Sequence, residues 1–548
     1  MGVLFSLLVL PPFAFLVYTS FVEQRRLQFV GFTLQNYRYV FDSTSISLIG
    51  NTLIFAVGSS LIALVVGVVS AWLSERTNAL FRRAAFVAAF VTLSVPLIVK
   101  IIGWILLLGP QAGALTTLLM WLLRSDQPPF ELFSLAGMTV LEGMLWSPVV
   151  FLLAIGPFRA MDPALEEAAA MSSATMAQTI RRVTLPLMTP ALLGILLLAF
   201  IRALEAFDVP LLVGQPAGVE LLTTHIYQST RTGLFPRYGE AGAYGVLLVL
   251  LVGLALVPYY RIVREGKRFA TITGRGFRPR TIDLGAWRLP ASLLLLVMPL
   301  FLLAPVLILL WASLLPYYLP PNLGALATLS FQNYTVALAY PNVQLGAWNS
   351  LIAAVTSASA IALLAILAAW AIARSGSRFG AVVDFLSSLP LVFPGIVLGL
   401  AIMQMFLLVS NPIYGTVWII VFAYVICYLP YGMRYAHPAT LAIHTELEEA
   451  ARIAGAGTPT VLRRIVLPLA LPAIAALWIY VVLITARELS LAVLLAGAQS
   501  QVIAVVILDM WHSGQITVLA AFSCLLVVAL TSLAVLFQRL AVRYGFHG

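Results

Sequence analysis

Two polar segments of this chain carry nearly the same sequence. Island one is Glu166–Leu192, EEAAAMSSATMAQTIRRVTLPLMTPAL, and island two is Glu448–Ile474, EEAARIAGAGTPTVLRRIVLPLALPAI. A Glu-Ala-Ala triplet, an Arg-Arg pair and two prolines fall at matching places in both islands. Because both islands are polar in a very apolar chain, we expect the rest of the protein to hold them and to move them together.

A second group of candidate residues consists of charged side chains within apolar runs. Such charges are costly inside a membrane and usually face a cavity or a partner. Glu205 lies 19 residues after Pro186 and Glu488 lies 20 after Pro468, about 28–30 Å along a helix. Asp208 is predicted to lie one helical turn beyond Glu205, on the same face. The residues predicted to line a translocation pathway are Glu205, Asp208, Glu488, Arg202 and Arg487.

The alternative for these charges is a structural role, in which they pair only to hold helices together. Lys100, which also lies in an apolar run, has the same two interpretations. An acidic outer gate made by Glu205, Asp208 and Glu488 favours a cation as cargo. Arg202 and Arg487 oppose that interpretation, since they can neutralise the acids or meet an anionic ligand of a metal.

The remaining residues show no catalytic or metal-binding pattern. The Gly-Lys pair at Gly266-Lys267 lacks the glycine spacing and the Ser or Thr of a nucleotide-binding loop. The histidines are scattered and none has the spacing of a metal site. We therefore predict no catalytic residue, no resident metal and no cofactor bound by this chain, which makes it a non-enzyme.

The composition is that of a polytopic membrane protein. Hydrophobic residues make up 61% of the 548 residues and charged residues only 9%, far below the roughly 25% charge of a soluble domain. Apolar runs of about 20 residues recur along the chain, the length that a helix needs to cross a bilayer. The net charge of +10 is explained by basic loops between spans, so nucleic acid is not an expected partner.

The spans are arranged as an internal duplication. Each half contains Gln-Asn-Tyr, then Asn-Thr-Leu or Asn-Ser-Leu at a span start, then an island. We predict an all-α protein of about twelve transmembrane helices in two pseudo-symmetric six-span halves, with span one at Val3–Phe21 rather than a signal peptide. Span three is expected at 85–108, as one helix that Pro96 and Gly103 loosen, and span nine at 381–409, also as one helix. Most basic residues lie on the island side, which is therefore predicted to be cytoplasmic.

The predicted domains follow this duplication. The first half covers 1–262 with its loop at 162–190, and the second half covers 289–548 with its loop at 444–472. The basic segment 263–288 between them is expected to be a cytoplasmic linker without a regulatory role.

Each island is predicted to form a helix, a turn and a second helix. Asp162 should cap the first helix of island one, while Thr445 and Glu448 have the spacing of a capping box in island two. Gly455 and Gly457 should end the first helix of island two, and Leu-Pro should end the second helix of each island at the membrane. A rigid amphipathic projection of this kind fits a groove in another protein. The alternative is an interfacial helix that rests on lipid, which the duplication disfavours.

The islands also resemble the signature loop of ABC importer permeases, in which the loop forms the coupling helix that docks into an ATP-binding subunit. Island two matches the signature fully, and island one has Ser173 in place of its glycine. The residues assigned to coupling by this resemblance are Glu167, Ala168, Ala169, Ser173, Leu185, Pro186, Glu449, Ala450, Ala451, Gly455, Leu467 and Pro468.

The fusion of two such halves is similar to the ferric-iron transport permeases. Further similarities lie at 204–210, 270–277 and 487–490. The resemblance implies a multi-pass protein of the bacterial inner (cytoplasmic) membrane that imports cargo from a periplasmic substrate-binding protein. It implies two copies of a cytoplasmic ATP-binding subunit, which would bind ATP and Mg and hydrolyse the nucleotide.

Ferric iron is the expected cargo. Import of thiamine, polyamine or phosphonate by the same machinery is the alternative. A secondary transporter with twelve spans in two parallel halves is the alternative from another class. Such a carrier needs no cytoplasmic partner, so the duplicated islands count against it.

Overall fold

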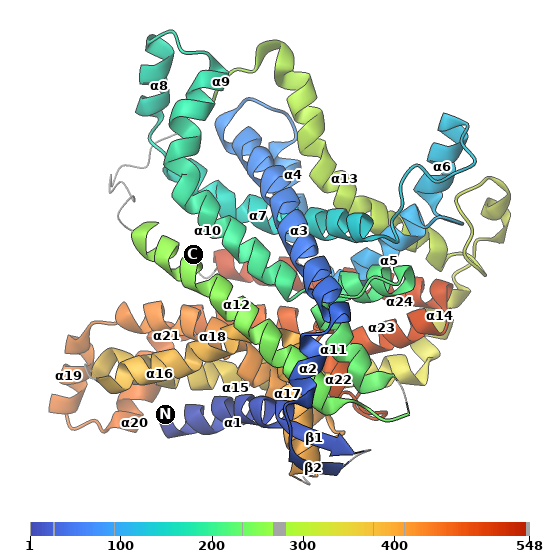
Figure 1. Ribbon diagram of the computed structural model, residues 1–548. Helices are drawn as coiled ribbons and strands as arrows, with labels where there is room; N and C mark the ends of the chain where they lie inside the picture. Colours follow the sequence, from blue (N-terminus) through green and yellow to red (C-terminus); the bar gives the residue numbers. More distant parts are fainter. Residues whose placement is uncertain are drawn as a thin grey trace. The chain divides into compact units, whose positions relative to one another are not determined.

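The fold is almost entirely helical (Figure 1). The computed structural model describes residues 2–25, 28–92, 94–232, 234–266, 281–375, 378–409 and 412–543. Among these residues, ten helices are long and apolar enough to cross a membrane, or twelve if each of two bent helix pairs is one span. The prediction of a polytopic helical membrane protein with about twelve spans is therefore confirmed.

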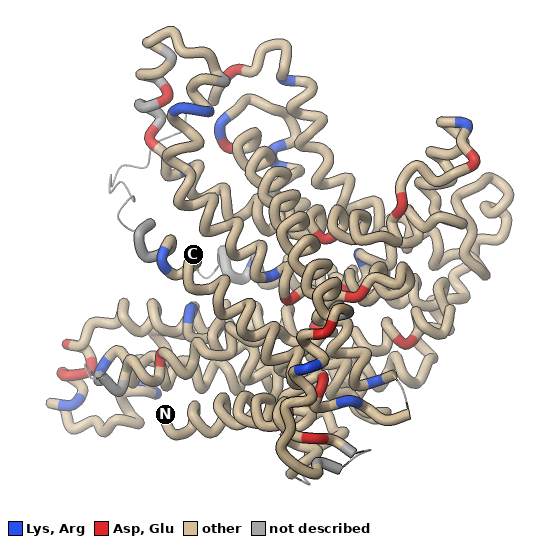
Figure 2. Tube along the Cα trace, viewed as in Figure 1, with Lys and Arg blue, Asp and Glu red and all other residues tan. Residues whose placement is uncertain are grey.

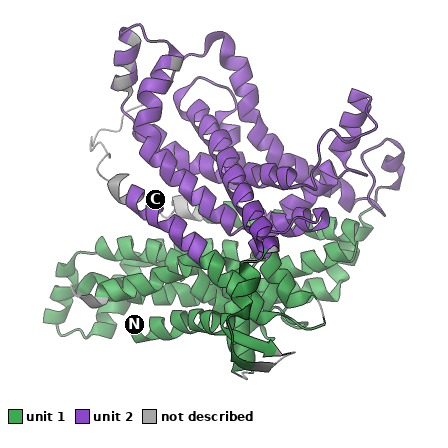
Figure 3. Ribbon diagram, in the orientation of Figure 1, with its two compact units in different colours: residues 1–42, 225–249, 330–548 green, residues 43–224, 250–329 purple. Residues whose placement is uncertain are grey.

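The chain divides into two compact units (Figure 3). Unit 1 contains residues 1–42, 225–249 and 330–548, and unit 2 contains residues 43–224 and 250–329. The first span of each half, α1 (Gly2–Ser20) or α13 (Arg288–Ser313), thus lies in the unit that contains most of the other half. The boundaries of the predicted halves stay a prediction.

Unit 2 is built on α3 (Ser43–Arg76) packed against α7 (Leu135–Ala160). Small residues let the two helices approach closely, since a Cβ on Gly67 would lie 2.6 Å from Val150 Cγ1. Gly143 of α7 meets α3 in the same way. The other long helices of unit 2 are α4 (Arg82–Thr92), α5 (Leu97–Leu108), α10 (Leu185–Leu204) and α13, which packs on α4 and α5.

Unit 1 has a matching core of α15 (Pro341–Ser375), α18 (Val417–Leu441) and α21 (Leu467–Thr485). The exchanged helix α1 packs on α16 (Arg378–Ser388) and α17 (Gly395–Leu408). A buried hydrogen bond of 2.6 Å from Thr19 Oγ1 to Gln404 Oε1 joins α1 to α17. The amide of Gln404 in turn donates to the Tyr238 carbonyl at 2.9 Å.

The remaining helices and strands are short, except for two long helices, α12 (Tyr238–Gly266) and α24 (Ile516–Arg543). A two-stranded antiparallel hairpin follows α1. These elements are β1 (Val22–Arg25), β2 (Gln28–Phe32), α2 (Gln35–Val40), α6 (Ala114–Leu123), α11 (Leu222–Arg231), α12 (Tyr238–Gly266), α14 (Gln332–Ala339), α22 (Ala492–Leu495), α23 (Ile503–His512) and α24 (Ile516–Arg543).

Spans three and nine differ from the prediction of single helices. The first is the pair α4 and α5, bent by 115°, and the second is the pair formed by 380–392 and α17, bent by 105°. In each pair a proline, Pro96 or Pro394, directly precedes the second helix in an extended conformation. Because proline lacks an N–H and restricts the residue before it, the helix breaks there and restarts in a new direction.

Charged residues gather towards helix ends and connections, with long uncharged stretches between them (Figure 2). Residues 267–280 of the predicted linker lie outside the described residues. The segment after them is fixed to unit 2, because Asn78 Nδ2 donates to Asp283 Oδ1 at 2.6 Å and Ile282 N donates to the Arg76 carbonyl at 2.8 Å. The Gly285 N–H and the Asn78 amide lower the pKa of Asp283.

Candidate coupling site at the two islands

The first helix of each island begins in a different way. In α8 (Pro163–Met171), Asp162 Oδ1 accepts the Ala164 N–H at 2.9 Å, which confirms the predicted cap. In α19 (Thr445–Ile453) the cap position belongs to His444. The predicted capping box is wrong, because the Glu448 carboxylate is bound elsewhere.

Glu448 and its counterpart Glu166 are buried anchors that fix each island to a long helix. Glu166 pairs with the fully buried Arg76 at the end of α3, and Thr184 Oγ1 donates to its other oxygen at 2.9 Å. Glu448 pairs with Arg374 at the end of α15 at 2.8 Å, and Trp370 Nε1 donates to it at 3.2 Å.

No local signal in the sequence marks either anchor. Removing one partner of a buried ion pair costs about 3–5 kcal/mol, since it leaves a charge uncompensated. The anchors therefore make each island a rigid extension of the helix bundle to which it is attached.

Both first helices end in the same left-handed turn. Gly455 has φ +86°, and Gly455 N and Ala456 N donate to the Arg452 and Ala451 carbonyls at 2.9 Å each, as in a Schellman motif. In island one Ser173 has φ +60°, and Ala174 N donates to the Ala169 carbonyl at 3.1 Å. Serine thus keeps the turn that the glycine makes, in a conformation that L-residues adopt at a cost.

A π-helical segment contains the Arg-Arg pair of each island. It spans Ile180–Thr184 in island one and Leu462–Val466 in island two, and the helix continues from it into α10 or α21. The prediction that Leu-Pro ends the second helix is therefore wrong. Pro186 and Pro468 cannot donate to the carbonyl four residues earlier, and the wider turn accommodates them.

The residues assigned to coupling lie along these turns and helices. Glu449 and Ala450 are exposed on α19, Gly455 and Ser173 are exposed at the turns, and Ala451 is half-buried. In island one, Ala168 is exposed and Ala169 half-buried; Glu167 lies within α8, and its side chain is outside the described part. The four residues of the Leu-Pro pairs, Leu185, Pro186, Leu467 and Pro468, are exposed.

Two large apolar side chains stand exposed at equivalent places on the islands. Met171 at the end of α8 is 84% exposed and Ile453 at the end of α19 is 88% exposed. Burying a side chain of this kind is worth about 1.5–3 kcal/mol. Together with the buried anchors, these residues give each island a rigid, partly apolar surface.

In unit 2, two of the predicted pathway residues form an ion pair beside a tryptophan. Arg202 Nη1 pairs with Glu205 Oε2 at 2.7 Å, and the Arg202 guanidinium lies 5.4 Å from the centre of the Trp146 ring. The Trp146 side chain also hydrogen-bonds to Glu142, a fully buried carboxyl of α7 that sequence analysis overlooked. Glu142 is itself a charged residue within an apolar run, so the criterion that selected the pathway residues also applies to it.

The prediction that Glu205 and Asp208 lie on one face of the same helix is wrong. The helix α10 ends at Leu204, and the chain is non-helical at Ala206 and Phe207 before helical structure resumes at Asp208. In unit 1, α21 likewise ends at Thr485, so Arg487 and Glu488 also follow a helix end. These charges therefore lie where two long helices stop, among irregular backbone.

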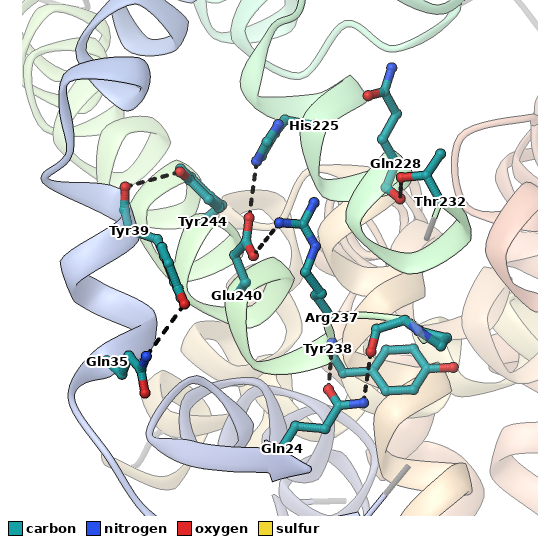
Figure 4. Close-up of polar contacts among 11 residues, drawn as sticks. Gln24, Gln35, Tyr39, His225, Gln228, Thr232, Arg237, Tyr238, Glu240 and Tyr244 are labelled. Carbon is teal, nitrogen blue, oxygen red and sulfur yellow. Dashed lines mark hydrogen bonds and ion pairs between the residues drawn. The ribbon is translucent and has the colours of Figure 1, made fainter. Parts of the chain in front are cut away.

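A polar cluster in unit 1 joins α11 to the start of α12 (Figure 4). The buried Glu240 carboxylate meets His225 Nε2 at 3.4 Å and Arg237 Nη1 at 2.8 Å. Next to it, Gln24 of β1 accepts the Tyr238 N–H at 2.7 Å (Figure 4). Glu240 lies in the first turn of α12, where the helix dipole favours a carboxylate. The cluster therefore fixes α11, the hairpin and α12 to one another within unit 1.

Comparison with known families decides the identity of this architecture. The model of the family described as "Binding-protein-dependent transport system inner membrane component" matches residues 63–266 and again residues 361–544. The chain belongs to this family. It is an ABC importer permease, a multi-pass inner-membrane protein with the family domain present twice. Both matches include one island and the arginine, Arg76 or Arg374, that anchors it.

Individual relatives extend the similarity along the chain. The permease is 26% identical to "Ferric transport system permease protein FbpB" of Actinobacillus pleuropneumoniae over 74% of this chain. It spans only 58% of that relative's own length. It is also 26% identical to "Putative ferric transport system permease protein FbpB 1" of Haemophilus influenzae, over 85% of this chain and 73% of the relative. "Spermidine/putrescine transport system permease protein PotB" of Escherichia coli is 25% identical over 47% of this chain and 93% of the relative.

Proposed function

We propose that this permease imports ferric iron across the inner membrane, powered by two copies of a cytoplasmic ATP-binding subunit that dock on the islands. A periplasmic substrate-binding protein delivers the iron to the opposite side. ATP and Mg bind to the docked subunits and not to this chain. The cargo is drawn from the two relatives named as ferric transport permeases.

The observation that carries the docking proposal is the duplicated, anchored island. A force applied to an island reaches the bundle only if the island does not swing freely, and the Glu166–Arg76 and Glu448–Arg374 pairs hold it to a long helix. The exposed ends at Met171 and Ile453 supply an apolar contact for the ATP-binding subunit. ATP binding then supplies the differential affinity for two states that a conformational switch requires.

Docking is tested by a charge placed on that apolar contact. We expect Ile453→Asp combined with Met171→Asp to abolish copurification of the ATP-binding subunit and iron uptake together. The matched control is Leu234→Asp, an equally apolar side chain that is 95% exposed in the loop between α11 and α12. Unchanged copurification and uptake in the double variant would refute docking at the islands.

A second cargo is favoured by the match to the spermidine and putrescine permease. Both cargoes are cations, so both suit the carboxylates predicted in the pathway. Reconstituting the permease with its ATP-binding subunit and its binding protein separates the two. Uptake of radioactive iron without uptake of spermidine supports the ferric proposal, and the opposite result replaces it.

A further inference from the structure

The bent span of unit 1 places irregular backbone beside a carboxylate. The helix stops at Leu389–Val392, which forms a short 3₁₀ turn, and restarts at Gly395 after Pro394. Non-helical backbone at membrane depth is tolerated only where it is buried in protein or lines a cavity. The side chains packed on this break therefore indicate its function.

Glu488 lies against the break. A Cβ on Gly395 would lie 3.4 Å from Glu488 Oε1 and 2.5 Å from Ser490 Oγ, so this contact needs glycine. Glu488 Oε1 accepts from Ser490 Oγ at 2.5 Å, and Tyr428 Oη donates to Glu488 Oε2 at 2.8 Å. Three oxygen-bearing side chains thus converge at the point where the span is broken.

Tyrosines continue this group along α18. Tyr424, Tyr428, Tyr431 and Tyr435 follow the spacing of one helix face, a stretch of about 16 Å at 1.5 Å per residue. Tyr480 of α21 packs between the last two, with ring centres 5.8 Å from Tyr431 and 5.9 Å from Tyr435. The row begins among buried residues next to Glu488 and ends at the half-exposed Tyr435, towards island two.

A ferric ion needs oxygen donors throughout its passage. It is a small, highly charged cation, and such hard cations take oxygen ligands. Moving it bare through a low-dielectric interior is prohibitively costly. Phenol groups meet the need without placing permanent charge in the membrane, because they are neutral until a metal displaces the proton.

We propose that Glu488, Tyr428 and Ser490 form a transient oxygen-donor site for ferric iron at the break between α16 and α17, from which the tyrosine row leads towards island two. This inference rests on the proposed ferric cargo. On binding, the Tyr428 O–H bond breaks and an O–Fe bond forms, while the phenol proton leaves to water. No electron is transferred, and the Glu488 carboxylate provides a second anionic oxygen.

The site is tested in the purified permease by loading it with ferric nitrilotriacetate and recording the visible charge-transfer absorbance of a ferric phenolate. We expect the band in the wild type and in Tyr334→Phe, a control tyrosine of α14. We expect it to be lost in Tyr428→Phe and weakened in Glu488→Gln. Absence of the band from the wild type, or its survival in Tyr428→Phe, overturns the proposal.

Transport separates this inference from the proposed function. In the reconstituted system, Tyr428→Phe should reduce iron uptake about tenfold or more, which is the typical effect of losing a metal-site partner. The ATP-binding subunit should stay bound. Spermidine uptake by the wild type with no iron uptake would instead refute the ferric cargo. Iron uptake at the wild-type rate in Tyr428→Phe would refute the site alone.

Discussion

At the left-handed turn, island one has Ser173 where island two has Gly455. Replacing Ser173 by glycine should stabilise island one locally. A non-glycine residue in this conformation costs about 1–2 kcal/mol, a cost that glycine does not have. Ser173 has φ +60° and Gly455 has φ +86° at the equivalent place. We expect Ser173→Gly to lower the free energy of the closed turn by about 1 kcal/mol, which is about a fivefold change in the local opening equilibrium.

Amide hydrogen exchange measures that equilibrium. The probe is the Ala174 N–H, whose bond to the Ala169 carbonyl exists only when the turn is closed. Its exchange should slow about fivefold in Ser173→Gly and stay unchanged in Ser173→Ala, which removes the hydroxyl and keeps the conformational cost. The reverse change, Gly455→Ser, should speed exchange of the Ala456 N–H by a similar factor. Equal exchange in wild type and Ser173→Gly would refute the reasoning.

Three further predictions concern stability. Glu448→Gln should destabilise the permease by about 3–5 kcal/mol in thermal unfolding, because it leaves the largely buried Arg374 guanidinium uncompensated, whereas Glu449→Gln at the exposed neighbour should be neutral. Gly67→Ala should cost about 1–3 kcal/mol by forcing α3 away from α7, while Gly156→Ala, whose added Cβ meets no atom within 4 Å, should unfold like wild type. Asn78→Ala should release the chain after the linker, seen as faster trypsin cleavage after Arg288; an unchanged cleavage rate would show that other contacts hold this segment.

Local sequence signals predicted the islands well. Duplication marked their place, Asp162 identified a helix start, and the glycine at 455 identified a left-handed turn. The same signals failed where a long-range partner competes with a local one. Glu448 has the spacing of a capping residue, but Arg374 of α15 binds it instead. Nothing near Arg374 in the sequence indicates that partner, since the pair forms only when two helices meet.

The bent spans were missed for a different reason. Hydropathy measures how apolar a segment is and carries no information on its direction, so 381–409 looks like one long helix. Pro394 was the available signal, because proline and its predecessor disfavour a continuous helix. Proline within apolar runs is ambiguous, however: Pro148 and Pro430 lie inside α7 and α18, which continue through them. Packing around each proline decides between these outcomes, and a single sequence does not contain that packing.

The exchange of first spans between the units sets an order for biosynthesis. Unit 2 receives its last helix when α13 ends at Ser313, shortly past the middle of the chain. α1 is made long before its packing partners α16 and α17, which end only at Leu408. Throughout that interval α1 must remain in lipid without α16 and α17, and its Thr19 hydroxyl lacks the Gln404 side chain that it later contacts. A ribosome that stalls between these points would therefore leave one unit complete and the other without its interior, which makes this interval the stage at which membrane quality control has most to act on.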